Sequence, residues 1–258
     1  MADPGNPTLD SWRRVGQHNE QSETMGSTVR CMQETGFHRW GYVLYRCTYS
    51  DDVAWDYYVQ NIYEAVRDSL ELFGGDLLLM KYFHLEIIED RATLDNASKR
   101  YVREQFKEWC AVHQSVENGG PATGSLYDGE IPMFHFCLYA DQKCLDKVGG
   151  HKEWAAKKAE EDEARAREGR PPLRQKYGEP LVPVVLIDKD CDPEGEGPDG
   201  YEEIEGCTQE FVGWVYIEVG DIVSLYDLLH RERLMDDCTS YKRPPLVYNS
   251  VSSEVMPL

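Results

Sequence analysis

The sequence contains no apolar run of about 18 residues, the length that a membrane-spanning helix needs. Residues 1–20 lack the apolar core of a signal peptide, and their acidic residues do not fit a mitochondrial transit peptide. There is no Cys-x-x-Cys pair, and the eight cysteines are scattered singly, which favours free thiols over a disulfide framework. We therefore expect a cytoplasmic protein with no membrane partner.

Motifs for common catalytic groups are also missing. The sequence has no Walker A loop, no Gly-x-Ser-x-Gly elbow and no His-x-x-x-His pair. Asp188, Asp190 and Asp192 have the spacing of the first calcium ligands of an EF-hand. Pro193, however, stands where that loop needs glycine, and Asp199 stands where it needs glutamate. A solvated acidic loop is the favoured interpretation, so the sequence predicts neither a metal nor a cofactor.

Positive charge is scarce. The 258 residues include 27 Lys and Arg against 47 Asp and Glu, which gives a formal net charge of -20. Such a charge repels DNA and anionic lipids at long range and attracts cationic small molecules. The composition therefore argues against a protein that coats nucleic acids and against a DNA partner. Only local patches of positive charge are left for contact with RNA.

Hydrophobic residues make up 41% of the chain, which is enough to build a buried core. Composition divides the chain into a mobile N-terminal arm (1–37), a single domain (38–247) and a C-terminal tail (248–258). Within the domain, a charged helix and linker form an insertion at 151–180, and an acidic loop occupies 188–210.

Strand-like segments alternate with helical ones in this domain. The predicted strands are 41–49, 77–88, 133–139, 181–187 and 211–218. The run at 77–88 predicts a central strand, whereas Pro183 indicates an edge or a bulge. The predicted helices are 55–73, 96–113, 142–148, 152–168 and 222–229. The pattern predicts an α/β fold with a mixed or largely parallel sheet of about five strands and helices packed on it.

Two polar clusters follow predicted strands, where open α/β sheets usually bind ligands. Their carboxylates are suited to bind a cationic substrate, such as a guanidinium, through charge-assisted hydrogen bonds, and buried carboxylates also transfer protons. The catalytic candidates in these clusters are Glu89, Asp90 and Tyr45. The substrate-binding candidates are Arg46, Asp51, Asp52 and Arg91.

The same positions have a purely structural interpretation. Asp51 and Asp52 are suited to cap a helix, and Glu89 is suited to a surface ion pair with Arg91. Cys47 and Ser50 lie close by, but they qualify as nucleophiles only if a neighbouring group activates them. The sequence does not identify that neighbour.

A basic patch near residue 170 opposes the overall charge. It contains Arg165, Arg167, Arg170, Arg174 and Lys176, with Glu168 as its one acidic residue. The patch is either a solvated helix end and linker or a contact for the backbone of tRNA, for which its four arginines are the candidates. A second basic group lies in the predicted helix 96–113 and contains Lys99, Arg100, Arg103 and Lys107.

Three segments carry a family resemblance: WGYVLYRCTYSDDVAW at 40–55, FHLEIIEDRATLDNASKRYVREQFKEW at 83–109 and YKRPP at 241–245. Over residues 37–247 the chain resembles a widespread group of fungal proteins that includes arginine-containing cyclodipeptide synthases. The resemblance implies synthesis of cyclo-arginine-Xaa diketopiperazines from aminoacyl-tRNAs, arginyl-tRNA among them, in a secondary-metabolite pathway. It assigns no catalytic residue.

The residues fit this chemistry in part. An aminoacyl ester is already activated, so the reaction needs neither ATP nor a metal, and an acidic pocket suits an arginyl side chain. The net charge of -20 argues against RNA binding. Two alternatives therefore stay open: a cofactor-independent tailoring enzyme of secondary metabolism, and a non-enzymatic acidic interaction protein.

Overall fold

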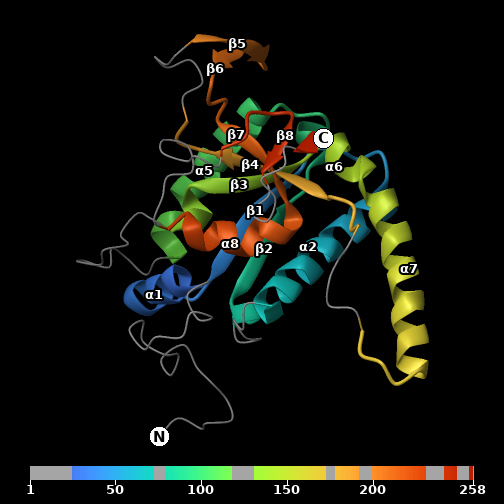
Figure 1. The fold of residues 1–258 in the computed structure, drawn as a ribbon. Helices are drawn as coiled ribbons and strands as arrows, with labels where there is room; N and C mark the ends of the chain where they lie inside the picture. The colour runs from blue at the N-terminus through green and yellow to red at the C-terminus, as the bar shows by residue number, and fades with distance from the viewer. Residues whose placement is uncertain are drawn as a thin grey trace, which may run out of the picture.

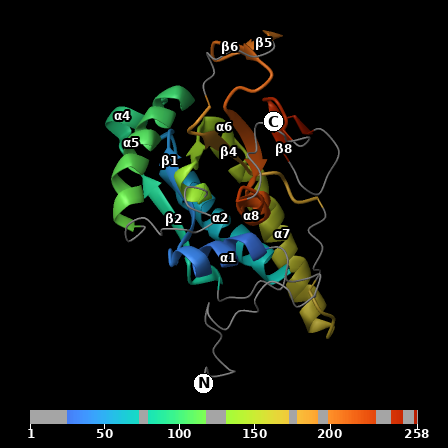
Figure 2. The same cartoon turned by 90° about the vertical axis from the view of Figure 1, so that its left-hand side faces the viewer.

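The computed structural model describes residues 25–72, 79–117, 131–172, 178–191, 199–230, 241–248 and 256–257. These residues form a seven-stranded mixed sheet with helices on both faces and a separate two-stranded hairpin (Figures 1 and 2). The α/β fold class predicted from the sequence is confirmed. No helix within the described ranges is both long and apolar enough to span a membrane.

The main sheet combines parallel and antiparallel pairs. Its strands are β1 (Trp40–Arg46), β2 (Phe83–Ile88), β3 (Phe136–Ala140), β4 (Pro183–Asp188), β7 (Trp214–Glu218), β8 (Leu246–Tyr248) and β9 (Met256–Pro257). They lie in the order β2-β1-β3-β4-β7-β8-β9. β1 is parallel to β2 and β3, whereas β4 is antiparallel to both of its neighbours. The hairpin consists of β5 (Asp199–Ile204) and β6 (Cys207–Gln209).

The chain changes direction across the sheet at β1. It leaves β1 through α2 (Asp52–Leu72) to β2, and then crosses through α5 (Lys99–Glu117) to β3 on the other side of β1. Open α/β sheets bind ligands outside the carboxyl ends of strands at such a switch point. Both predicted polar clusters follow strands that end at this edge.

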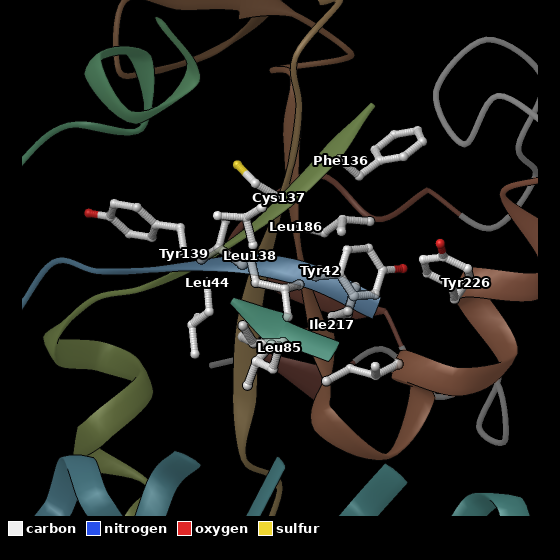
Figure 3. Packing of buried hydrophobic residues seen from close by; sticks show 14 of the residues in the cluster. Tyr42, Leu44, Leu85, Phe136, Cys137, Leu138, Tyr139, Leu186, Ile217 and Tyr226 are labelled. Carbon is white, nitrogen blue, oxygen red and sulfur yellow. The ribbon is translucent and has the colours of Figure 1, made fainter. Parts of the chain in front are cut away.

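β1 is buried along its whole length because helices cover both faces of the sheet. Its side chains alternate between the two faces. Tyr42 points toward Tyr226 of α8 (Ile222–Leu228), with ring centroids 5.2 Å apart (Figure 3). Gly41 has a φ of 129°, and a β-carbon there would lie 2.1 Å from the carbonyl oxygen of His84 in β2. Only glycine permits this close approach of the two strands.

The two long helices beside β1 are amphipathic, as their sequence periodicity predicts. α2 buries Trp55, Tyr58, Ile62, Val66 and Leu70. α5 buries Val102, Phe106, Trp109 and Cys110. The remaining helices are α1 (Gly26–Thr35), α4 (Arg91–Leu94), α6 (Gln142–Asp146) and α7 (Val148–Arg167), with 3-10 turns at Pro132–Phe134 and Val219–Asp221.

The prediction of a mobile arm over residues 1–37 is wrong for its second part. Residues Gly26–Thr35 form α1, and Val29 and Met32 belong to the buried core. The backbone N–H and the hydroxyl of Thr28 both donate to Asp227 Oδ1 of α8, at 2.8 and 2.9 Å. Residues 1–24 lie outside the described residues.

The prediction of a long central strand at 77–88 also needs correction. β2 spans only Phe83–Ile88 and pairs with β1 alone, at the edge of the sheet. Most of its side chains are half-buried, so its apolar run reflects contact with helices on its faces rather than a central position. Within the predicted acidic loop 188–210, residues 199–209 form the β5–β6 hairpin, and 192–198 lie outside the described residues.

Candidate functional site

The first predicted polar cluster is organised around Arg46, the last residue of β1. One terminal nitrogen of its guanidinium donates to Asp52 Oδ1, and the other lies 3.5 Å from Glu89 Oε1. Its carbon lies 4.4 Å from the ring centroid of Tyr49 and 4.9 Å from that of Trp55. The structure thus brings together residues of both predicted clusters. Their carboxylates, however, already bind a guanidinium from the chain itself.

Asp51 and Asp90 both cap helices. Asp51 Oδ1 accepts a hydrogen bond from the backbone N–H of Ala54 at 2.9 Å, in the first turn of α2. Asp90 accepts from the backbone N–H of Ala92 at 3.0 Å and from the hydroxyl of Thr93 at 2.8 Å, at the start of α4. These contacts favour the structural interpretation of the two aspartates.

Two further members of the predicted site lie apart from this arrangement. The Arg91 guanidinium carbon lies 6.0 Å from the ring centroid of Tyr49, at the margin of the cluster. Tyr45 precedes Arg46 in β1, so its side chain points to the opposite face of the sheet. It is buried, its hydroxyl has no hydrogen-bond partner among the described residues, and burial raises its pKa. The structure does not bring Tyr45 to the carboxylates of Glu89 and Asp90.

The possible nucleophiles after β1 differ in their surroundings. Cys47 is buried, and burial followed by the charge of Asp141 raises its pKa to about 12, so its thiol is protonated at neutral pH. The hydroxyls of Ser50 and Thr48 each donate to Gln142 Oε1 at 2.6 Å. An amide oxygen does not remove a proton, and no general base contacts Ser50 within the described residues.

The predicted tRNA-contact patch at the end of α7 is largely engaged within the chain. Arg165 donates to the carbonyl oxygen of Pro171 at 2.9 Å. Arg167 forms an ion pair with Glu163 at 3.2 Å, and Arg170 forms one with Glu168. Arg174 lies outside the described residues. These contacts are typical of a solvated helix end, and the RNA-binding interpretation of this patch stays a prediction.

The second basic group forms a cleft. Three of its members, all from the first turns of α5, face the start of β7 and the turn of the β5–β6 hairpin. The cleft has a volume of about 120 Å³ and is lined by Lys99, Arg100, Arg103, Ile204, Glu205, Gly206, Cys207, Val212 and Trp214. The fourth member, Lys107, instead forms an ion pair with Glu104. We refer to this feature as the cationic cleft.

Lys99 is one of two buried charges in the cationic cleft, together with Arg103. The Lys99 side chain is 8% exposed, and its Nζ lies 2.7 Å from Glu205 Oε1. The same nitrogen lies 4.1 Å from the ring centroid of Trp214 and 5.0 Å from that of Tyr139. Lys99 therefore combines one ion pair with two cation–π contacts, which together compensate for its burial.

Arg103 forms the inner wall of the cleft. Its Nε donates to the carbonyl oxygen of Asp188 at 2.9 Å, and its Nη2 donates to that of Gly213 at 3.0 Å. Gly213 has a φ of 78°, and a β-carbon there would lie 2.3 Å from Arg103 Nη2. Glycine at this position therefore allows the guanidinium to approach the backbone.

The charges of the cleft oppose the local preference of a helix. The amino end of a helix carries a partial positive charge and is stabilised by acidic residues. α5 instead begins with Lys99 and Arg100 and has no acidic residue in its first turn. Lys99, Arg100 and Arg103 contribute three positive charges against the one negative charge of Glu205. An excess of positive charge at the amino end of a helix favours the binding of an anionic ligand.

Sequence reasoning identified the basic residues of the cleft as a group but missed Glu205 and Trp214. Both lie more than 100 residues from Lys99 along the chain, and nothing near them in the sequence marks them as part of a site. Within the described residues, no group of three or more His, Cys, Asp or Glu is placed to hold a metal ion.

Comparison with known proteins returned no match to this chain, whether with family models, with curated proteins or with solved structures. The function therefore has to be argued from the chain's own residues and from the resemblance noted in its sequence.

Proposed function

We propose that this protein is a tRNA-dependent synthase that forms an arginine-containing cyclic dipeptide from aminoacyl-tRNAs, in the cytoplasm of a fungus and as part of a secondary-metabolite pathway. The observation that carries the proposal is the cationic cleft, which concentrates Lys99, Arg100 and Arg103 in a chain of net charge -20. The cleft is a local region of positive charge that is suited to bind an anion, although the negative net charge of the whole chain disfavours RNA binding.

The size of the cleft suits the end of an RNA rather than its body. Small-molecule sites usually enclose about 300–1,000 Å³. The volume here, about 120 Å³, is enough for one phosphate group and its immediate surroundings. The ring of Trp214 lines the same site but is buried, and it holds the Lys99 ammonium 4.1 Å from its centroid. The acidic remainder of the surface then repels the other phosphates, which limits contact to one orientation.

The proposed reaction consists of two aminolysis steps. The α-amino group of one aminoacyl-tRNA attacks the ester carbonyl of another, a C–N bond forms, the ester C–O bond breaks, and the amine proton passes to the departing ribose oxygen. The amine of the resulting dipeptidyl ester then attacks its own ester, which closes the ring and releases the second tRNA. No oxidant, reductant or nucleotide is consumed. The sequence candidates for moving the proton remain Glu89 and Asp90.

The test is production of the cyclic dipeptide by the full chain. We would express it in yeast or a filamentous fungus supplied with isotopically labelled arginine and search extracts by mass spectrometry for labelled cyclo-arginine-Xaa. The expected product is absent from the empty-vector control. It forms with purified protein and a mixture of aminoacyl-tRNAs that includes labelled arginyl-tRNA, and it disappears after ribonuclease treatment. Soluble, folded protein that yields no labelled product in either setting would contradict the proposal and favour the tailoring enzyme or the interaction protein.

A paired substitution links the product to the cleft. Arg100→Gln removes one cleft charge, and Arg167→Gln removes one charge from the exposed end of α7. We expect Arg100→Gln to reduce product formation at limiting tRNA and Arg167→Gln to leave it unchanged. Equal effects of the two substitutions would mean that general charge, not the cleft, controls activity.

A further inference from the structure

The turn of the β5–β6 hairpin places a carboxylate in the cationic cleft. Ile204 pairs with Cys207, so Glu205 and Gly206 form a two-residue turn. Both residues have positive φ, 50° and 88°. Turns of this kind favour Asn, Asp or Gly, and a longer side chain at positive φ is strained. The turn itself therefore does not explain a glutamate at position 205.

The contact with Lys99 does explain it. The Glu205 carboxylate lies 2.7 Å from the enclosed ammonium of Lys99, and no other carboxylate of the described residues forms an ion pair with that group. Glu205 is itself 44% exposed, so solvent reaches the pair from the hairpin side. The structure therefore shows an acidic group from the chain paired with one of the cations that line the cleft.

We propose that the cationic cleft is a phosphate-binding subsite, that Glu205 occupies the position of the ligand's phosphate in this structure, and that a phosphodiester at the end of an RNA displaces it. This inference rests on the proposed function and names the group that the cleft recognises. A phosphate presents several charged oxygens, so it contacts more than one of the cations that line the cleft, Lys99 among them. Arg103 stays hydrogen-bonded to the backbone carbonyls of Asp188 and Gly213, and its positive charge attracts the phosphate without direct contact.

Displacement of Glu205 requires only a local movement. The hairpin has a second attachment, because Arg243 donates to the carbonyl oxygens of Glu202, Cys207 and Gln209 at 2.7–3.2 Å. Its guanidinium also lies 5.4 Å from the ring centroid of Tyr201. The Glu205 side chain is therefore free to leave Lys99 while the hairpin stays attached to the body of the protein.

The test compares two neutralising substitutions on the same hairpin. Glu205→Gln removes the carboxylate from Lys99, and Glu203→Gln removes the same charge from an exposed position two residues away. Binding of inorganic phosphate and of the trinucleotide CCA to the purified full chain is measured by calorimetry at constant ionic strength. We expect Glu205→Gln to bind both probes about five- to tenfold more tightly than wild type, because a like charge a few ångströms away has been removed. Glu203→Gln should bind as wild type does.

Lys99→Met in the Glu205→Gln background should abolish the gain, and circular dichroism establishes whether that variant is folded. If it is not, Arg100→Gln replaces it and should remove part of the gain. Equal or weaker binding by Glu205→Gln than by wild type would overturn the inference. A matching gain in Glu203→Gln would also overturn it, because the cause would then be net charge. A gain with phosphate and none with CCA would refute the RNA assignment.

The two proposals fail separately. A tighter Glu205→Gln complex in a protein that makes no cyclic dipeptide would leave the subsite standing and remove the synthase function. If the protein makes the cyclic dipeptide but Glu205→Gln does not change phosphate or CCA binding, the synthase function stands and the phosphate subsite is refuted.

Discussion

Cys47 lies directly after β1, yet its thiol is unsuited to nucleophilic attack. Burial and the nearby charge of Asp141 raise its pKa to about 12, so the thiolate that reacts with electrophiles forms only at strongly alkaline pH. At pH 8 the Cys47 thiol is therefore protonated in the folded protein. Its low ionisation and its burial both slow the reaction of the Cys47 thiol with electrophiles.

We therefore expect iodoacetamide at pH 8 to leave Cys47 unmodified in the folded protein and to modify it after denaturation. Cys191 is the least buried of the described cysteines and should be labelled first among them. Peptide mass spectrometry of timed samples measures both rates. Labelling of Cys47 as fast as Cys191 would show that the thiol is accessible and ionised, and would restore it as a candidate nucleophile.

Asp90 has two possible roles that one substitution separates. Asparagine caps a helix about as well as aspartate does. In Asp90→Asn the remaining side-chain oxygen still accepts from the backbone N–H of Ala92, and the amide NH2 that replaces Oδ2 is placed to donate to the hydroxyl of Thr93 instead of accepting from it. We expect its free energy of unfolding in urea to stay within about 0.5 kcal/mol of wild type. If the carboxylate transfers a proton, as the sequence predicts, product formation falls even though stability does not. Unchanged product formation would leave Asp90 as a helix cap alone.

At the scale of single elements, α1 shows how a short helix depends on distant contacts. It has ten residues, begins at a glycine and has no side-chain cap. A helix of this length is marginal in isolation. Its buried face and the Thr28 contacts with Asp227, 199 residues away, stabilise it instead.

Substitution within α1 tests whether the helix belongs to the core. Val29 is 1% exposed, so Val29→Asp places a charge in the core and should lower the free energy of unfolding by about 3 kcal/mol or more. Glu34→Gln, at an exposed position of the same helix, should change it by less than about 0.5 kcal/mol. Urea denaturation of the full chain measures both. A small effect of Val29→Asp would mean that α1 is not packed as described.

Elements whose signal is local were predictable from sequence, and those defined by long-range pairing were not. The periodicities of α2 and α5 are complete within each helix, so the sequence alone located them. The register of β2 against β1, and its place at the sheet edge, depend on partners that the sequence does not identify. Pro183 suggested an edge strand or a bulge, but it is the first residue of the interior strand β4, a position that tolerates proline.

The candidate site divides in the same way. Lys99, Arg100 and Arg103 share one helix, so their spacing alone groups them. Glu205 and Trp214 come from a hairpin and a strand that meet α5 only in the folded chain. The carboxylates expected to bind a substrate guanidinium instead hold Arg46, a contact that depends on how β1, β2 and α2 meet at one edge of the sheet.

Across the whole molecule, two basic surfaces compete for the role of RNA contact within a strongly acidic chain. At the end of α7 and just after it, Arg167 and Arg170 are exposed and paired with glutamates. On α5, Lys99, Arg100 and Arg103 line a cleft, and Lys99 and Arg103 are buried. Binding to phosphates releases counterions, so the salt dependence of affinity reports how many phosphates are neutralised. A contact confined to the cleft, which has room for one phosphate, predicts a shallow dependence, with a slope of log affinity against log salt of about -0.7 for single-stranded RNA.

We expect Arg100→Gln to reduce the magnitude of that slope by part of the 0.7 or so that one phosphate contact contributes, because Lys99 remains, and Arg167→Gln to leave the slope unchanged. Fluorescence anisotropy of labelled tRNA at several KCl concentrations measures the slope for each variant. The two substitutions change the net charge equally, so a difference between them cannot arise from long-range attraction. A smaller slope for Arg167→Gln would show that the RNA contact lies at the end of α7. A steep slope for the wild-type protein would show that the RNA contacts a far larger surface than the cleft provides.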